Sequence, residues 1–128
     1  IMWGEDEAAL NLTENTQPAL MAVSMAVVRV LEGQGGLSVA RACSYVAGHS
    51  LGEYSALTAA GSLKLADTAR LLKIRGTSMQ KAVPVGVGSM AAILGLDLPD
   101  VEAIAKDASN SHIVEAANDN SDGQVVVS

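Results

Sequence analysis

The segment Gly48-His49-Ser50-Leu51-Gly52 is the strongest indication of the fold of the first part of the sequence. A short apolar run at residues 44–47 precedes it, and residues 51–60 have the composition of a helix that stops at a glycine. A serine between two glycines at this spacing is typical of a nucleophile elbow, a tight strand-to-helix turn. The pattern therefore predicts a buried strand, a sharp turn and a helix, with the glycines leaving room for the neighbouring backbone.

The turn also predicts chemistry. A strained elbow pushes the Ser50 hydroxyl outward, and the backbone N–H of Leu51 at the helix start could stabilise an oxyanion. The alternative is a structural turn in which Ser50 and Glu53 form a helix-capping box. His49 points away from its neighbour on an elbow, so we expect it to line the site rather than to act as a base. His112 is the alternative base within the chain.

Arg75 is the second candidate for a functional role. On a predicted helix over residues 65–81 it shares a face with Leu71, Leu72 and Met79. A guanidinium on an apolar face needs an anionic partner, and its planar fork suits a carboxylate. Arg75 is therefore a candidate clamp for an acidic substrate; an internal ion pair or a side chain reaching out to solvent is the alternative.

The remaining pattern predicts two subdomains that meet near Pro84. In the first, we expect a helix from Pro18 to residue 32 that is buried all round and ends at Gly33, and a short helix within residues 37–43. In the second, the pattern predicts a strand, a helix and two further strands, over residues 90–95, 100–108, 113–117 and 124–127. This β-α-β-β order is the first part of a split β-α-β, or ferredoxin-like, unit.

Composition excludes several classes of protein. The 128 residues carry a net charge of -6 and an aromatic fraction of only 2%, which argues against binding to nucleic acid. Cys43 is the single cysteine, so an internal disulfide and a cysteine-based zinc site are excluded, and we expect a reducing, cytoplasmic compartment. The longest apolar stretch, residues 18–31, is shorter than the ~20 residues of a membrane span. The acidic residues have no metal-loop spacing.

Several motifs together resemble the malonyl-CoA:acyl carrier protein transacylases of bacterial fatty-acid synthesis. They occur in the order of that family and extend over nearly the whole chain. The matching segments are Thr16-Gln17-Pro18-Ala19, the run from Gly48 to Leu57, Arg75-Gly76 with Met79-Gln80, Met90-Ala91-Ala92-Ile93, and Asn118-x-Asn120-Ser121-x-Gly123-Gln124-Val125.

The resemblance implies a function and a set of site residues. A malonyl group would pass from coenzyme A to Ser50 and then to the phosphopantetheine thiol of acyl carrier protein, without a metal or redox cofactor. Leu51 would supply half of the oxyanion hole, and Arg75 would bind the malonyl carboxylate. The residues that would line or support the site are Gln17, His49, Met79, Asn118 and Gln124.

The resemblance also implies an architecture. Residues 1–84 would form part of an α/β-hydrolase-like catalytic subdomain, and residues 85–128 part of a ferredoxin-like small subdomain. The family's catalytic histidine would follow Ser128, and its second oxyanion donor would precede Ile1. We therefore expect a central portion of a monomeric enzyme, with little turnover when isolated.

Three other functions remain open from the sequence. An acyltransferase domain of a polyketide or modular synthase would share the chemistry of Ser50 and Arg75. A serine hydrolase with the same elbow would release free acid instead. A non-enzymatic module that docks a carrier protein would use neither residue.

Overall fold

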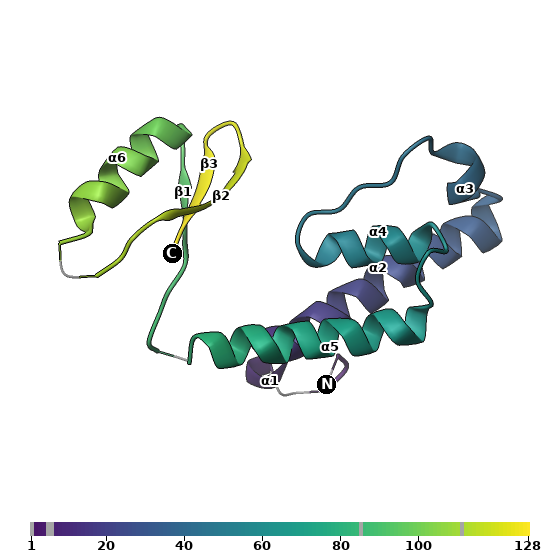
Figure 1. Cartoon of the computed structure of the whole chain (residues 1–128). Helices are drawn as coiled ribbons and strands as arrows, with labels where there is room; N and C mark the ends of the chain where they lie inside the picture. The colour runs from purple at the N-terminus through teal and green to yellow at the C-terminus, as the bar shows by residue number, and fades with distance from the viewer. Residues whose placement is uncertain (1, 5–6, 85, 111) are drawn as a thin grey trace. The chain divides into compact units, whose positions relative to one another are not determined.

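The structure, a computed structural model, describes residues 2–4, 7–84, 86–110 and 112–128. It divides into two compact units, Ile1–Ala82 and Val83–Ser128, each of which is described by itself. Over the described residues the first unit is helical, whereas the second combines a helix with a small antiparallel sheet (Figure 1). This mixture of helices and a sheet is consistent with the predicted α/β class.

The first unit is built from helices of very different length. In chain order they are α1 (Glu7–Asn11), α2 (Thr13–Gly35), α3 (Val39–Ala42), α4 (Leu51–Ala59) and α5 (Leu65–Ala82). The predicted helices at residues 37–43, 51–60 and 65–81 are confirmed as α3, α4 and α5. Among the described helices, none is both long enough and apolar enough to cross a membrane.

The predicted strand at residues 44–47 does not form. These residues have no regular secondary structure, and the side chain of Tyr45 is 92% exposed. A strand needs a partner for its N–H and C=O groups, and the described part of the first unit contains no other strand. The prediction of a buried strand is therefore wrong here, although the turn that follows it is present.

Helix α2 begins earlier than predicted. It starts at Thr13, so Pro18 lies inside the helix instead of being its first residue. At that position proline lacks the N–H that would bond to the carbonyl of Glu14. The added turn has compensating contacts: the Thr16 hydroxyl donates to the carbonyl oxygen of Leu10 at 2.5 Å, and the turn packs against α5. Tertiary contact thus outweighs the local preference of proline.

Helix α2 also ends later than predicted and is buried on one face only. It continues past Gly33 to Gly35, and Gly36 caps it in the left-handed conformation, with φ 64°. The expectation that the helix is buried all round is wrong for this chain. The large apolar side chains that it exposes are Leu20, Val23, Val27, Val30 and Leu31.

A small hydrophobic core connects three helices. Met21 and Met25 of α2 and Leu72 of α5 are almost completely buried against one another. Leu51 and Tyr54 of α4 pack against this cluster. The core therefore ties the helix that follows the elbow to the helix that carries Arg75.

The backbones of helices α2 and α5 come into contact at Gly76. A Cβ atom built at this position would lie 2.5 Å from the Cα of Glu14 and 2.8 Å from the carbonyl oxygen of Thr13. No side chain fits in that space, so glycine is required for the two backbones to come this close. The close approach places the first turns of α2, including Gln17, beside α5.

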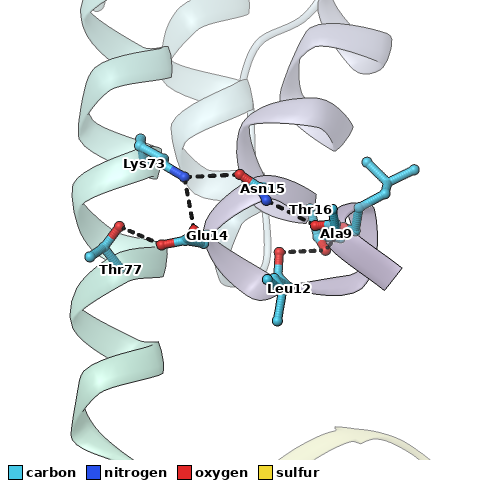
Figure 2. Close-up of polar contacts among 8 residues, drawn as sticks. Ala9, Leu12, Glu14, Asn15, Thr16, Lys73 and Thr77 are labelled. Atoms are coloured by element: carbon cyan, nitrogen blue, oxygen red, sulfur yellow. Dashed lines mark hydrogen bonds and ion pairs between the residues drawn. The ribbon is translucent and has the colours of Figure 1, made fainter. Parts of the chain in front are cut away.

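Polar side chains also join α2 and α5 at this crossing of the two helices near Gly76, as Figure 2 shows. The Lys73 ammonium lies 3.2 Å from a Glu14 carboxylate oxygen and donates to the Asn15 side-chain oxygen at 2.9 Å. The Thr77 hydroxyl donates to the other Glu14 oxygen at 3.1 Å. Charge and hydrogen bonds therefore join α2 to two successive turns of α5.

Two buried threonines set the position of α4 against α5. The hydroxyls of Thr58 and Thr68 lie 2.7 Å apart, and both side chains are buried. Each hydroxyl has one hydrogen to donate. The arrangement with the shortest hydrogen bonds has Thr58 donating to the Tyr54 carbonyl at 2.7 Å and Thr68 donating to Thr58. This pair fixes how α4, with the elbow at its start, sits on α5.

The second unit contains β1 (Ala91–Leu94), α6 (Leu98–Ala108), β2 (Ala116–Ser121) and β3 (Gln124–Val127). The strand order is β1-β3-β2, and both outer strands run antiparallel to β3. Val101 and Ala105 of α6 are buried together with Val125 of β3, so the helix covers one face of the sheet. The predicted order of a strand, a helix and two strands is confirmed.

One strand in this unit is displaced from its predicted position. We expected a strand over residues 113–117, but β2 begins at Ala116 and Ile113 is 81% exposed. The reason lies at Ser109, whose hydroxyl donates to the Ala105 carbonyl at 2.8 Å and accepts from the Val114 N–H at 3.0 Å. A side chain therefore satisfies the backbone that the predicted strand would have used for pairing.

We expect Thr58→Val to lower the free energy of unfolding by about 1 kcal/mol, because the buried Thr68 hydroxyl keeps only its longer hydrogen bond, to the Lys64 carbonyl at 3.1 Å. The double variant Thr58→Val/Thr68→Val should cost less than the sum of the single changes, since the hydrogen bond between the two hydroxyls is lost only once. Urea denaturation of the four proteins measures the coupling. Strictly additive losses would show that the two hydroxyls do not interact.

The ion pair at Glu14 predicts a dependence of stability on pH. The hydrogen bond from Lys73, then that from Thr77, stabilises the ionised carboxylate and holds the pKa of Glu14 below its ordinary value of 4.5. Because the pKa is lowered in the folded state, the contribution is present above pH 4.5 and is lost as the pH falls below it.

The variant Glu14→Gln provides the control for this effect. It should unfold with a flatter pH dependence in the acidic range and with a smaller response to added salt, since the pair is exposed to solvent. Unfolding curves of both proteins at neutral and acidic pH measure the difference. Identical curves would contradict a role for the ion pair.

Candidate active site

The elbow forms as a strained turn at the start of α4. Ser50 has φ 54° and ψ -118°, and it is the only described residue other than glycine with a positive φ. The left-handed region is costly for a residue with a side chain, and such strain is concentrated at functional sites. The backbone conformation expected of a nucleophile elbow is therefore present.

The two glycines of the motif differ in what they do. A Cβ at Gly48 would lie 2.0 Å from the carbonyl carbon and oxygen of Gly52, so Gly48 has to be a glycine for the turn to close. A Cβ at Gly52 would meet nothing within 4 Å among the described residues. The steric reason that the sequence suggested for both glycines therefore holds for Gly48 alone.

Neither the Ser50 hydroxyl nor the Leu51 N–H is used in a hydrogen bond that caps α4. The Ser50 side chain makes no capping hydrogen bond, so the capping-box alternative with Glu53 is wrong. Its Oγ instead accepts a hydrogen bond from Nη2 of Arg75 at 2.9 Å. Within the described part of the chain, the N–H of Leu51 donates to no acceptor and remains available at the helix start.

Arg75 is held by neutral partners. Its Nη1 donates to the side-chain oxygen of Gln17 at 2.5 Å, and its guanidinium carbon lies 6.0 Å from the centre of the Tyr54 ring. No carboxylate of the described residues is within ion-pair distance of it, in contrast to Arg70, which pairs with Asp67. The alternative that Arg75 forms an internal ion pair is therefore wrong for the described residues. The half-buried guanidinium of Arg75 faces Ser50 with no carboxylate of the described residues beside it.

Gln17 is the link between Arg75 and the start of α2. The side chain is only 3% exposed. Its amide nitrogen donates to the Thr13 hydroxyl at 2.8 Å and to the Met79 sulfur at 3.3 Å. The structure therefore brings together Gln17, Ser50, Arg75 and Met79, which the sequence had placed in one site.

The other predicted site residues are His49 in the first unit and Asn118, Gln124 and His112 in the second unit. The His49 side chain is exposed and makes no hydrogen bond to a described residue, whereas the His49 carbonyl accepts from the Gly52 N–H at 2.9 Å. Asn118 and Gln124 lie on β2 and β3 of the second unit, where Gln124 accepts from Asn120 at 3.2 Å. His112 belongs to the same unit and borders an open surface pocket next to α6.

Sequence reasoning missed Thr13 and gave no role to Tyr54. The signal for Thr13 was its spacing of four residues from Gln17, which places the two on one helix face.

Among the described residues, no group of three or more His, Cys, Asp and Glu side chains could hold a metal ion.

Comparison with known proteins gives a consistent result. The family model described as the acyl transferase domain matches residues 1–128. The chain is 49% identical over 118 residues to the malonyl CoA-acyl carrier protein transacylase of Escherichia coli strain K12, covering 92% of the chain and 37% of that protein.

Solved structures agree in fold. The acyl-carrier-protein-S-malonyltransferase of Bartonella henselae has a TM-score of 0.85 and 60% identity, over 96% of this chain and 39% of that one. A malonyl-transacylase in complex with its type II PKS acyl-carrier protein has a TM-score of 0.82 and 47% identity, over 94% of this chain and 38% of that one. The chain thus spans about two fifths of the length of its relatives and belongs to the acyl transferase domain family.

Proposed function

We propose that the chain is the central part of a malonyl-CoA:acyl carrier protein transacylase. The observation that carries this proposal is Arg75, a guanidinium without an anionic partner that donates to the hydroxyl of the strained Ser50. Such an arrangement suits an acyl group that carries its own carboxylate. The names of the relatives support malonyl as that group.

The first half-reaction would form an ester on Ser50. The Ser50 oxygen attacks the thioester carbonyl of malonyl-CoA and gives up its proton to a base, and the oxyanion is stabilised by the N–H of Leu51. The carbon–sulfur bond then breaks and the thiolate of coenzyme A leaves, taking up a proton. In the second half-reaction, the phosphopantetheine thiol of acyl carrier protein attacks the ester and restores Ser50.

Arg75 would recognise the malonyl carboxylate during both half-reactions. In the ester, one methylene group separates the carboxylate from the carbonyl carbon bound to Ser50. A guanidinium 2.9 Å from the Ser50 oxygen is therefore close enough to reach the carboxylate. Gln17 would keep one nitrogen of Arg75 occupied, so that the other is free to leave the serine for the substrate.

The general base is assigned to neither histidine of the chain. His49 has no hydrogen bond to Ser50, and His112 is on the second unit. We propose that a histidine in the remaining length of the enzyme provides the base, as the family resemblance implies. Acyl transfer between a thiol and a hydroxyl changes no oxidation state, so we propose that the reaction uses no redox cofactor. We also propose that it uses no metal, as the family resemblance implies.

The two units would correspond to the two subdomains of the family. We propose that residues 1–84 belong to an α/β-hydrolase-like catalytic subdomain and residues 85–128 to a ferredoxin-like one. Support for the second comes from α6, which connects β1 to β2 while β3 lies between them, as in a split β-α-β unit. We propose roles for Asn118 and Gln124 in the same reaction, as the family resemblance implies. We propose a monomeric, cytoplasmic enzyme.

A carrier protein of polyketide synthesis is a second candidate acceptor. The observation that favours it is the structural similarity to a malonyl-transacylase bound to a type II PKS acyl-carrier protein. Parallel transfer assays with the carrier proteins of fatty-acid and polyketide synthesis distinguish the two. Release of free malonate without a carrier product would identify a hydrolase instead.

We expect Ser50→Ala to abolish formation of the malonyl-enzyme, because no other described group is placed to attack the thioester. Intact mass after incubation of the enzyme, at the full length of its relatives, with malonyl-CoA measures the adduct. Ser55→Ala on the same helix is the matched control and should keep the adduct. An adduct of unchanged yield in Ser50→Ala would refute the role of Ser50.

We expect Arg75→Ala to lower malonyl transfer by about 100-fold or more, since a charge-assisted bond to a carboxylate is worth about 1.5–3 kcal/mol and the fixed geometry is also lost. Acetyl transfer, which offers no carboxylate, should change much less. Initial rates with both thioesters measure the effect, and Arg70→Ala, an exposed cation of the same helix, should change neither rate. Equal losses for the two substrates would indicate that Arg75 is structural.

A further inference from the structure

The amide of Gln17 can serve Arg75 in only one of its two orientations. A guanidinium has donors and no acceptor, so it needs the Gln17 oxygen, and the Gln17 nitrogen would place donor against donor. The nitrogen must then find acceptors on its other side. Because Gln17 is 3% exposed, these acceptors have to come from the protein rather than from water.

Two side chains supply those acceptors from different helices. The Met79 sulfur, on α5, lies 3.3 Å from the Gln17 nitrogen and can only accept. The Thr13 hydroxyl, in the first turn of α2, lies 2.8 Å from the same nitrogen and is the stronger acceptor. Thr13 and Gln17 are four residues apart on one helix, so their contact is part of the helix itself.

The backbone around Thr13 is also held in place. Its carbonyl oxygen is one of the atoms that a Cβ at Gly76 would strike, at 2.8 Å. Gly76 follows Arg75 directly, so the crossing that brings Thr13 to α5 also brings the Gln17 amide to the guanidinium. A chain of contacts thus runs from Thr13 through Gln17 and Arg75 to the Ser50 oxygen.

We propose that Thr13 is a positioning residue that makes the enzyme selective for acyl groups bearing a carboxylate. Its hydroxyl fixes the Gln17 amide with the oxygen toward Arg75, and Gln17 in turn holds the guanidinium beside Ser50. Thr13 touches neither the serine nor the substrate. The inference rests on the proposed function, because the selectivity concerns malonyl against acetyl groups.

The test compares three variants of the enzyme at the full length of its relatives. Thr13→Val keeps the shape of the side chain and removes the hydroxyl, whereas Thr13→Ser keeps the hydroxyl. Thr77→Val is the matched control, since its hydroxyl bonds to Glu14 at the same crossing and not to Gln17. The rates of acyl-enzyme formation from malonyl-CoA and from acetyl-CoA are measured for each.

We expect Thr13→Val to lower kcat/KM for malonyl-CoA about tenfold, the size expected when a buried amide loses the stronger of its two acceptors, with the loss mainly in KM. The rate with acetyl-CoA should stay within about twofold, because acetyl offers nothing for Arg75 to bind. Thr13→Ser should restore the malonyl rate, and Thr77→Val should leave the malonyl-to-acetyl ratio unchanged. Equal losses for both substrates, no loss in Thr13→Val, or failure of Thr13→Ser to restore the rate would overturn the proposal.

A second readout separates this inference from the proposed function. The side-chain amide signals of Gln17 in a nitrogen–proton correlation spectrum, assigned by their disappearance in Gln17→Met, report its hydrogen bonds without any substrate. They should shift in Thr13→Val and return toward the wild-type position in Thr13→Ser. If the wild-type enzyme forms no malonyl ester, the proposed function fails; unchanged Gln17 signals in Thr13→Val would refute the positioning role by itself.

Discussion

The close approach of α2 and α5 at Gly76 is the constraint on which the site depends. No side chain fits between this position and the backbone of Thr13 and Glu14. Because the two backbones meet there, Gln17 lies opposite Arg75, and the buried methionines of α2 pack on Leu72. The elbow adds the second requirement, since Gly48 allows the turn that presents Ser50 to the same guanidinium.

Much of the local structure could be predicted from the sequence, and the errors have physical reasons. Helices α4 and α5 could be predicted from the spacing of their apolar residues, and the end of α4 from the glycine that follows it. The start of α2 could not be read from Pro18, because the turn before it is stabilised by contacts with α5 that are distant in sequence. Residues 44–47 have the composition of a strand but no described strand to pair with.

The site was predictable in part. Apolar spacing around Arg75 and the glycine pattern around Ser50 each predicted a functional residue, and the structure joins them at 2.9 Å. Gln17 was assigned only through family resemblance, since nothing in its neighbourhood marks a buried amide. Thr13 was missed because a helix that began at Pro18 would have left it outside, and its spacing from Gln17 then carried no meaning.

The proposed function depends above all on Arg75, which we propose binds the carboxylate of the acyl group carried by Ser50. The most direct measurement is a crystal structure of the enzyme, at the full length of its relatives, trapped as the malonyl ester of Ser50. We expect Nη2 of Arg75 to leave the serine oxygen and donate to the malonyl carboxylate, while Nη1 stays on the oxygen of Gln17. A carboxylate that points away from Arg75, or is bound by another cation, would contradict it.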